Sequence, residues 1–318
     1  MSADLLSDVL TMTRLTGALM FRLDITGPWG ITAHPTVEKF ASLLPPGTTH
    51  VIAFHVVLDG ECWCRQSDGS RLAVAAGQVV VIPNGDPHEI GDQSDCNPKP
   101  LVEWLGGRSV LDLRKANLQT GTGSTVSLLC GFLGCDRRAF EPLFASLPSG
   151  FTVALGEQRK SLVQYAINEA LDDRPGTASL RVRLAELLFT ESLRLHMQSL
   201  PDNATGWLAG LRDPHVRQAL HAMHETPCRD WSVESLARLS ASSRSNLAAR
   251  FRELLGVPPM HYLTELRMQL AAQRLVGEHE SLERVAGEVG YDSSAAFQRA
   301  FKRHFGQSPA AWRRQALR

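Results

Sequence analysis

The chain has 318 residues, of which 43% are apolar and 21% charged, with 25 Gly and 17 Pro. This composition is typical of globular proteins and excludes collagen-like and disordered chains. At roughly 150 residues per domain, the length predicts about two domains. The 33 basic residues balance the 33 acidic ones, which taken alone argues against a nucleic-acid partner. The charge is unevenly distributed, however, because residues 207–318 hold 16 Lys and Arg against 11 Asp and Glu, and residues 1–206 hold 17 against 22.

We expect no export signal at the start of the chain. No stretch reaches the ~20 apolar residues of a spanning helix, and Arg14, Arg22 and Asp24 interrupt the place where a signal peptide has its apolar centre. We therefore expect a cytoplasmic protein without a membrane partner. In that compartment the six cysteines are expected to be reduced thiols, available as metal ligands or redox sensors rather than as disulfides: Cys62, Cys64, Cys96, Cys130, Cys135 and Cys228.

The region between about residues 51 and 133 is rich in β-branched and aromatic residues arranged in short runs. Turn signals such as Asp59-Gly60 and Asp68-Gly69 separate them. This spacing predicts an antiparallel sandwich or small barrel. The predicted strands are 50–57, 72–75, 78–82, 101–105 and 125–132.

Helical sequence follows at 158–171 and 178–197, interrupted by a stop signal at 172–177. The second helix has an apolar face that either covers its own β-domain or forms a dimer seam; its leucines are Leu180, Leu184, Leu187, Leu188 and Leu195. A Pro-Asp-Asn-Ala-Thr-Gly linker occupies 201–206. The predicted organisation is a sensor domain at 1–150, a helical connector with a dimerisation role at 151–206, and an all-helical domain at 207–318.

An internal repeat of about fifty residues dominates the C-terminal part. The segment 236–241 recurs as 285–290, at an offset of 49, and four landmarks then recur at an offset of 50, because the second turn is one residue longer. These landmarks are Leu247, Phe251, Gly256 and Pro259 in the first copy and Phe297, Phe301, Gly306 and Pro309 in the second. Each copy has the pattern of a helix-turn-helix, with a small residue in the first helix and apolar anchors at i, i+4 in the second.

A single helix over 260–276 is predicted between the two copies. Seventeen residues at 1.5 Å rise give a length of about 26 Å. This helix would hold two recognition helices at a separation comparable to the DNA helical repeat of about 34 Å, so that both can enter successive major-groove segments.

The outward residues of the two recognition helices are the predicted DNA contacts. In this pattern Arg299 suits guanine, Asn246 and Gln298 suit adenine, and the small residues of the first helix suit thymine methyl groups or DNA shape. The first helix contributes Ser243 as N-cap, Arg244, Ser245, Asn246, Ala248, Ala249 and, toward phosphate, Arg252; the second contributes Ser294, Ala295, Gln298, Arg299 and Lys302, with Arg303 behind.

These motifs resemble the signature of the AraC/XylS family of transcriptional regulators. The resemblance covers roughly residues 213–314 and is carried by Ala286-Gly287-Glu288-Val289-Gly290-Tyr291-Asp292-Ser293, Phe297-Gln298-Arg299-Ala300-Phe301-Lys302 and Gly306-Gln307-Ser308-Pro309. It implies a sequence-specific regulator that binds double-stranded promoter DNA, with RNA polymerase as a further candidate partner.

The N-terminal part resembles the cupin-type sensor domain of one AraC subgroup over most of residues 15–205. The second cupin motif is present as Gly77-x5-Pro83-x-Gly85-x2-His88-x3-Asp92, with Asp92 in place of the usual Asn. The first motif is degenerate, because His55 has no His-x-His pair beside it. The fold class is therefore α+β multidomain: a cupin-like β-barrel with a helical connector, then an all-α domain with two helix-turn-helix motifs joined by a long helix.

The barrel is the predicted sensor. His55, His88 and Cys130 are expected to converge inside it, as two imidazoles and a thiol suited to zinc, as core side chains satisfied by hydrogen bonds, or as contacts to an organic effector, for which Trp63 is a fourth candidate. Cys62 and Cys64 point to one face of a strand and are either structural or redox-active. Two histidines are too few for the usual cupin metal centre, so we expect no catalytic residues. A cupin metalloenzyme fused to a DNA-binding domain is the alternative to a regulator that senses a small molecule, metal or oxidant as a homodimer.

Overall fold

The structure is a computed structural model that describes residues 4–13, 15–45, 48–92, 96–137, 140–277 and 280–316. The chain divides into two compact units. One, called here the sensor unit, comprises 14–137 and 147–199; the other, the reader unit, comprises 1–13, 138–146 and 200–318.

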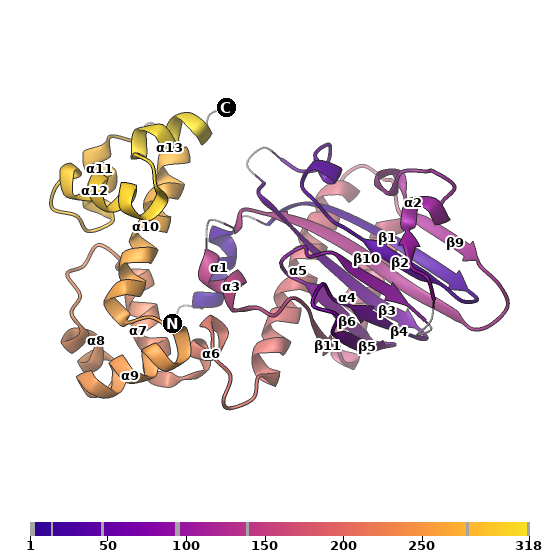
Figure 1. The fold of residues 1–318 in the computed structure, drawn as a ribbon, viewed down its shortest axis with the longest axis horizontal. Coiled ribbons are helices and arrows are strands. Elements are labelled where there is room, and N and C mark those ends of the chain that lie inside the picture. The colour runs from indigo at the N-terminus through magenta and orange to yellow at the C-terminus, as the bar shows by residue number, and fades with distance from the viewer. Residues whose placement is uncertain are drawn as a thin grey trace. The chain divides into compact units, whose positions relative to one another are not determined.

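Two facing β-sheets form the sensor unit (Figure 1). The larger sheet has the strand order β11-β6-β3-β10-β1-β9 and the smaller has β5-β4-β7-β2-β8. The strands are β1 (Thr16–Thr26), β2 (Gly30–Ala33), β3 (His50–Asp59), β4 (Glu61–Arg65), β5 (Arg71–Ala75), β6 (Gln78–Ile82), β7 (His88–Gly91), β8 (Lys99–Pro100), β9 (Lys115–Gln119), β10 (Thr125–Cys135) and β11 (Phe151–Ala154). Side chains from both sheets share one apolar core, and this is the predicted cupin-like architecture.

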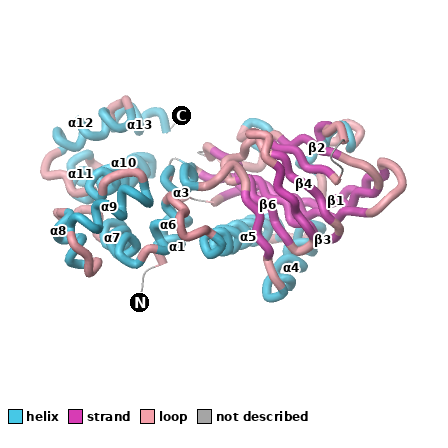
Figure 2. Tube along the Cα trace, turned by 60° about the horizontal axis from the view of Figure 1, so that its bottom comes forward, coloured by secondary structure: helices cyan, strands magenta, loops and turns pink. Residues whose placement is uncertain are grey.

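The larger sheet is buried on both faces. Along β3, Val51, Ala53 and Val57 point into the core between the sheets, whereas Ile52 and Phe54 are equally buried but lie outside that core. Helices α4 (Lys160–Leu171) and α5 (Thr177–Ser199) cover this second face (Figure 2). Burial on two faces explains why β3 and β10 read as nearly continuous apolar runs.

The apolar face of α5 was expected either to cover the β-domain or to form a dimer seam, and the structure shows that part of it covers the larger sheet. Leu184 and Leu188 are buried and belong to the face that covers the larger sheet, whereas Leu180 and Leu187 are exposed by 38% and 44%. The predicted apolar stripe is therefore divided between a covered edge and an uncovered edge.

One predicted strand is wrong. Residues 101–105 form a short helix, α2 (Leu101–Trp104), because Pro100 ends β8 and stands at the helix N-cap. The indole N–H of Trp104 donates to the Gly30 carbonyl oxygen at 3.0 Å, which ties this helix to β2.

Strand β1 was not predicted, because charged residues interrupt its apolar pattern. Arg22 and Asp24 form an ion pair at 2.9 Å on one face of the strand, and Lys115 of the neighbouring β9 reaches Asp24 at 3.0 Å. These charges satisfy one another beside the helical layer, so the strand is compatible with burial of Phe21 and Leu23 on the opposite face.

The reader unit is helical. Its helices are α1 (Leu5–Met12), α3 (Glu141–Ser146), α6 (Trp207–Arg212), α7 (Pro214–Glu225), α8 (Val233–Leu239), α9 (Arg244–Leu255), α10 (Pro259–Gly277), α11 (Leu282–Glu288), α12 (Ser294–Phe305) and α13 (Pro309–Ala316). Helices α8 and α9 form the first helix-turn-helix, α11 and α12 form the second, and α10 is the predicted connecting helix.

The structure shows the same N-caps and buried anchors in both copies of the repeat. Ser243 and Ser293 cap α9 and α12 by accepting a hydrogen bond from the backbone N–H three residues later, as N-cap serines do. All four predicted anchors are fully buried: Leu247, Phe251, Phe297 and Phe301. The two motifs therefore share one construction.

The division of the chain differs from the predicted ranges 1–150, 151–206 and 207–318 at three places. Helix α1 and helix α3 come from the N-terminal half of the sequence but belong to the reader unit, and residues 151–199 belong to the sensor unit. Neither helix carries a sequence motif that would have indicated this. Within the described ranges, no helix is long and apolar enough to cross a membrane.

The tight turns of the two motifs provide a stability test. Gly290 has φ +77°, and a Cβ there would lie 2.8 Å from the Cys228 carbonyl oxygen and 2.7 Å from the Arg267 guanidinium. The matching turn residue of the first motif, Ala241, already has φ +50°. We expect Gly290→Ala to lower the free energy of unfolding by about 1–3 kcal/mol through strain and overlap.

The matched control is Ala241→Gly. It removes the left-handed strain but adds backbone entropy to the unfolded chain, so the two effects nearly cancel, to within about 1 kcal/mol. Urea unfolding of the full chain measures both changes. An equally small change for both variants would contradict the close approach at Gly290.

Candidate functional sites

The predicted DNA contacts lie together on accessible faces of α9 and α12. Every one of them is exposed or half-buried, whereas the anchors on the opposite side of each helix are buried. The exposed ones are Ser243, Arg244, Ser245, Asn246, Ala249, Arg252, Ala295, Gln298, Arg299 and Lys302, and the half-buried ones are Ala248 and Ser294. Their contacts with DNA bases remain a prediction.

Some polar side chains of α9 already have partners within the reader unit. Arg244 pairs with Glu234 of α8 at 2.7 Å, and the Asn246 amide donates to the Ser242 hydroxyl at 2.9 Å. Arg250 pairs at 2.6 Å with Asp213, which caps α7. Arg244 and Asn246 must exchange these partners to reach DNA, whereas Arg250 holds α9 against α7 and has a structural role.

Two histidines meet inside the sensor unit. His55 lies on β3 and His88 begins β7 of the opposite sheet, and their Nε2 atoms are 2.9 Å apart. Both side chains are 3% exposed. Burial lowers the pKa of each imidazole, and for His55 the neighbouring His88 adds to the effect. Both rings are therefore neutral at physiological pH, and one donates a hydrogen bond to the other across the barrel.

An apolar pocket of about 310 Å³ opens beside this pair. His55 and Cys130 line it, as predicted, and they sit directly opposite each other on β3 and β10. Most of the lining is aromatic or aliphatic; it includes Phe21, Leu23, Ile31, Phe40, Ile90 and Phe132. The Phe40 and Phe132 rings are 4.8 Å apart. Sequence reasoning missed these phenylalanines because isolated aromatic residues carry no motif.

Trp63 does not line this pocket, and its predicted contact with an effector stays untested. Side chains alternate along β4, so Cys62 and Cys64 point into the core and Trp63 points to the other face of the sheet. There the Arg71 guanidinium lies 4.3 Å from the indole centroid. His88 does not line this pocket either; it contacts His55 and lines an adjoining pocket that shares Ala33 and Lys39 with it.

The predicted zinc set is incomplete. Structural zinc needs four ligands and catalytic zinc at least three from the protein, yet among the described residues no group of three His, Cys, Asp or Glu side chains is placed to hold a metal. The Nε2 atoms of His55 and His88 do converge, but they share a hydrogen bond. Zinc binding by His55, His88 and Cys130 stays an untested prediction.

The buried thiols have the properties of structural cysteines. Burial raises the pKa of Cys62 and of Cys64 to about 12, and it also raises the pKa of Cys130 and of Cys135. Since the thiolate is the reactive form, these groups are poor nucleophiles in the folded state. Cys228 is exposed.

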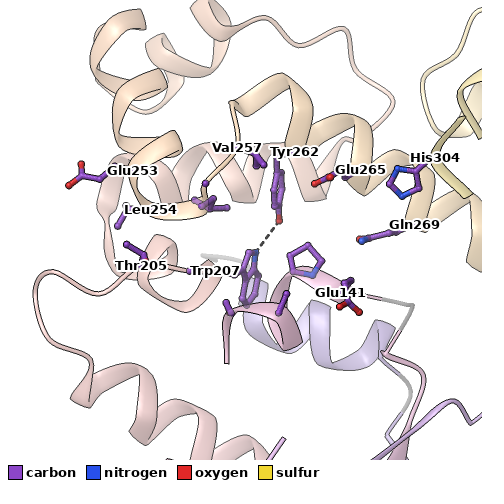
Figure 3. A pocket seen from close by; sticks show the side chains of 16 residues that line it. Glu141, Thr205, Trp207, Glu253, Leu254, Val257, Tyr262, Glu265, Gln269 and His304 are labelled. Atoms are coloured by element: carbon purple, nitrogen blue, oxygen red, sulfur yellow. Dashed lines mark hydrogen bonds between the residues drawn. The ribbon is translucent and has the colours of Figure 1, made fainter. Parts of the chain in front are cut away.

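A buried hydrogen-bond chain anchors α3 within the reader unit. The Trp207 indole N–H donates to the Tyr262 hydroxyl at 3.0 Å (Figure 3), and this hydroxyl shares a second hydrogen bond with Nε2 of His224 at 2.7 Å. Phe140, immediately before α3, packs edge-on against Trp207 at 5.1 Å and against His224 at 5.5 Å. Phe140 is fully buried, so a segment from the middle of the sequence is part of the core beneath the first helix-turn-helix.

A groove of about 610 Å³ lies beside this anchor, between α3 and helices α6, α9, α10 and α12. Figure 3 shows Glu265 and Gln269 of α10 and His304 of α12 along it. The Gln269 side-chain oxygen is buried and has no hydrogen-bond partner. Both helix-turn-helix motifs contribute to the groove, the first through Glu253 and Leu254 of α9 and the second through His304 of α12.

Comparisons with known proteins identify the family of both domains. Residues 4–198 match the model of a cupin family, and residues 236–315 match the model of a helix-turn-helix domain. An AraC-like transcription regulator of Streptomyces antibioticus is 31% identical over 99% of both chains. The transcriptional regulator AlkR of Acinetobacter baylyi is 31% identical over 82% of this chain and 87% of its own. The transcriptional activator RclR of Escherichia coli, described as specific for RCS, is 26% identical over 84% and 86%.

The chain belongs to the AraC family of transcriptional regulators, with an N-terminal cupin domain and a C-terminal helix-turn-helix domain. The predicted family and fold class are confirmed. These relatives are regulators and not enzymes, which favours the predicted regulator over the fused metalloenzyme.

His224 makes the stability of the reader unit depend on pH. Burial lowers its pKa to about 3, and nearby His221 adds to the shift. The unfolded chain, with a pKa near 6.5, binds more protons between pH 6.5 and 3. The free energy of unfolding therefore falls as the pH decreases through this window, by up to about 1.4 kcal/mol per pH unit.

His224→Gln keeps a hydrogen-bonding group beside the Tyr262 hydroxyl, because an amide can donate or accept, but does not titrate. We expect unfolding measured at pH 7.5, 6 and 5 to show a flatter pH dependence for the variant than for the wild-type protein. His55 and His88 contribute equally to both proteins and cancel in the comparison. Parallel pH profiles would contradict the buried, neutral state of His224.

Proposed function

We propose that this regulator binds specific promoter sites through α9 and α12, and that a small molecule held in the barrel pocket changes how strongly it does so. A ligand can shift a conformational equilibrium only by binding its two states differently. The pocket and the DNA-reading helices must therefore be coupled physically.

This coupling is supported by the strands β1 and β10, which pair with each other, line the pocket and lead to helices of the reader unit. β1 and β10 pair along their length, with Thr16 opposite Gly134 at one end. Both carry pocket residues, among them Phe21 on β1 and Phe132 on β10. At this shared end α1 precedes β1 in the sequence and α3 follows β10. Both helices belong to the reader unit.

A displacement of these strands by a ligand would act on both segments together. α3 follows β10 within a few residues, and Phe140 is fixed against Trp207 and His224. We infer that occupancy of the pocket changes the placement of the first helix-turn-helix through this segment.

The regulator is further proposed to act as a homodimer through the uncovered edge of the helical layer. The exposed apolar side chains Leu180 and Leu187 lie two turns apart on α5, and Tyr165 and Leu171 are exposed on α4. An exposed group of this kind is typical of protein–protein contacts.

Arg299→Ala tests the DNA contacts. The exposed guanidinium of Arg299 can pair with guanine in the major groove, so its removal should cost about 1–3 kcal/mol on the cognate site and relax the preference for one base pair. Fluorescence anisotropy with the cognate site and single-base variants measures both quantities.

Arg252→Ala is the matched control. As a predicted phosphate contact it should weaken binding to all sequences equally and reduce the salt dependence of binding. Unchanged affinity and unchanged base preference in Arg299→Ala would contradict the assignment.

Phe140→Ala tests the coupling. Truncating this buried ring leaves α9 and α12 intact but loosens the attachment of α3. We expect DNA affinity without effector to change little, whereas the difference in affinity between effector-loaded and free protein should shrink severalfold. The control is Phe144→Ala, a truncation of equal size four residues later, inside α3. An effector response that survives Phe140→Ala unchanged would exclude the α3 route.

A further inference from the structure

The histidine pair has only one arrangement of protons that satisfies its hydrogen bonds. Nδ1 of His88 lies 2.9 Å from the carbonyl oxygen of Asp86. A carbonyl can only accept, so Nδ1 of His88 carries the proton and donates. In a neutral imidazole the other nitrogen is then a bare acceptor, and Nε2 of His88 must accept from His55.

His55 is thereby fixed in the opposite tautomer. Its Nε2 donates to His88 at 2.9 Å, so its Nδ1 has a free lone pair. This nitrogen is buried and has no hydrogen-bond partner, although Cys130 stands directly opposite on β10. A buried polar atom without a partner destabilises the folded state, and a ligand that donates a hydrogen bond to it would remove this cost.

The pocket that the His55 ring lines limits what such a ligand can be. Its walls are apolar, with Phe21, Phe40 and Phe132 among them. Lys39 lies at the exposed edge, where its ammonium group donates to the His34 carbonyl oxygen at 2.9 Å. At Nδ1 of His55 the lone pair would repel the negative charge of a buried anion. A neutral hydrogen-bond donor would be stabilised by the same lone pair. A volume of about 310 Å³ is at the small end of ligand pockets.

We propose that the effector is a compact, neutral, mainly apolar molecule with one hydrogen-bond donor, a hydroxyl or N–H, which Nδ1 of His55 accepts. This inference rests on the proposed role of the barrel as the effector site and specifies the ligand class. His88 is a positioning residue: through its bond to Asp86 it sets the tautomer of His55 and so selects donors over acceptors of the same shape.

A matched pair of fluorescent probes separates these possibilities. 1-Naphthol carries a donor hydroxyl, and 1-methoxynaphthalene has the same rings without it. Titration into the full-length protein should give an affinity for 1-naphthol about three- to tenfold higher, as one neutral hydrogen bond provides. Equal affinities, or no binding of either probe up to its solubility, would overturn the ligand class.

Two His→Phe substitutions test whether His55 causes the preference for 1-naphthol. His55→Phe keeps a ring of similar size and removes the acceptor, so the preference for 1-naphthol should fall to about one. His34→Phe is the control, because His34 lines the same pocket at its exposed edge; it should leave the preference unchanged. A preference that survives His55→Phe would overturn the assignment.

A pocket-narrowing variant distinguishes failure of this inference from failure of the proposed function. Val110→Trp places a large ring in the pocket wall and should weaken both probes. If it weakens both but the wild-type protein binds them equally, the pocket is a ligand site and only the donor assignment is wrong. If it weakens neither, the probes bind elsewhere and the effector role of the pocket loses its support.

A last set of measurements examines the ring nitrogens directly. In ¹⁵N NMR of imidazole-labelled protein, a bare ring nitrogen resonates far downfield of a protonated one, so His55 should show a bare Nδ1 and His88 a bare Nε2. A proton on Nδ1 of His55 would overturn the inference. So would stoichiometric zinc in protein purified without a metal column and lost in His88→Ala, because a metal between the rings requires both Nε2 lone pairs.

Discussion

Burial of both faces of the larger sheet is the constraint on which the sensor unit depends. Because Ile52 and Phe54 lie under the helical layer while Val51 and Ala53 face the core, a one-residue slip of β3 would exchange the two sets. The paired strands β1 and β10 are held in register in the same way. A strand that cannot slip can still tilt or shift as a rigid body, and this makes β1 and β10 suitable carriers of a signal from the pocket.

The sequence was most informative where local chemistry repeats. The second helix-turn-helix could be located from Ser293, Phe297, Phe301 and Gly306 because caps and anchors have fixed spacings, and the structure has them as predicted. The strand at 101–105 was predicted wrongly because a short apolar run does not distinguish a strand from a helix. His55 and His88 were identified as a pair, but their tautomers depend on the Asp86 carbonyl, which only the fold brings close to them.

The attachment of α1 and α3 to the reader unit was beyond sequence reasoning for a different reason. Both are short amphipathic helices, and apolar residues such as Leu6 or Phe144 indicate that something covers them without indicating what. Long-range contacts of this kind have no local signal. The same holds for Trp207, His224 and Tyr262, which are ordinary core residues until Phe140 is seen to rest on two of them.

Because α1 and α3 belong to the reader unit, neither unit of this chain is one continuous stretch of sequence. A fragment cut at residue 207 would contain both helix-turn-helix motifs yet lack Phe140, leaving the Trp207 and His224 rings without their covering residue. An exchange of sensors between relatives would have to carry two separate segments across, not one, and leave the intervening α3 segment behind. Recombination at a single linker would thus yield chimaeras with an exposed apolar seam, and the sensor and reader of this chain are expected to evolve as one inherited piece.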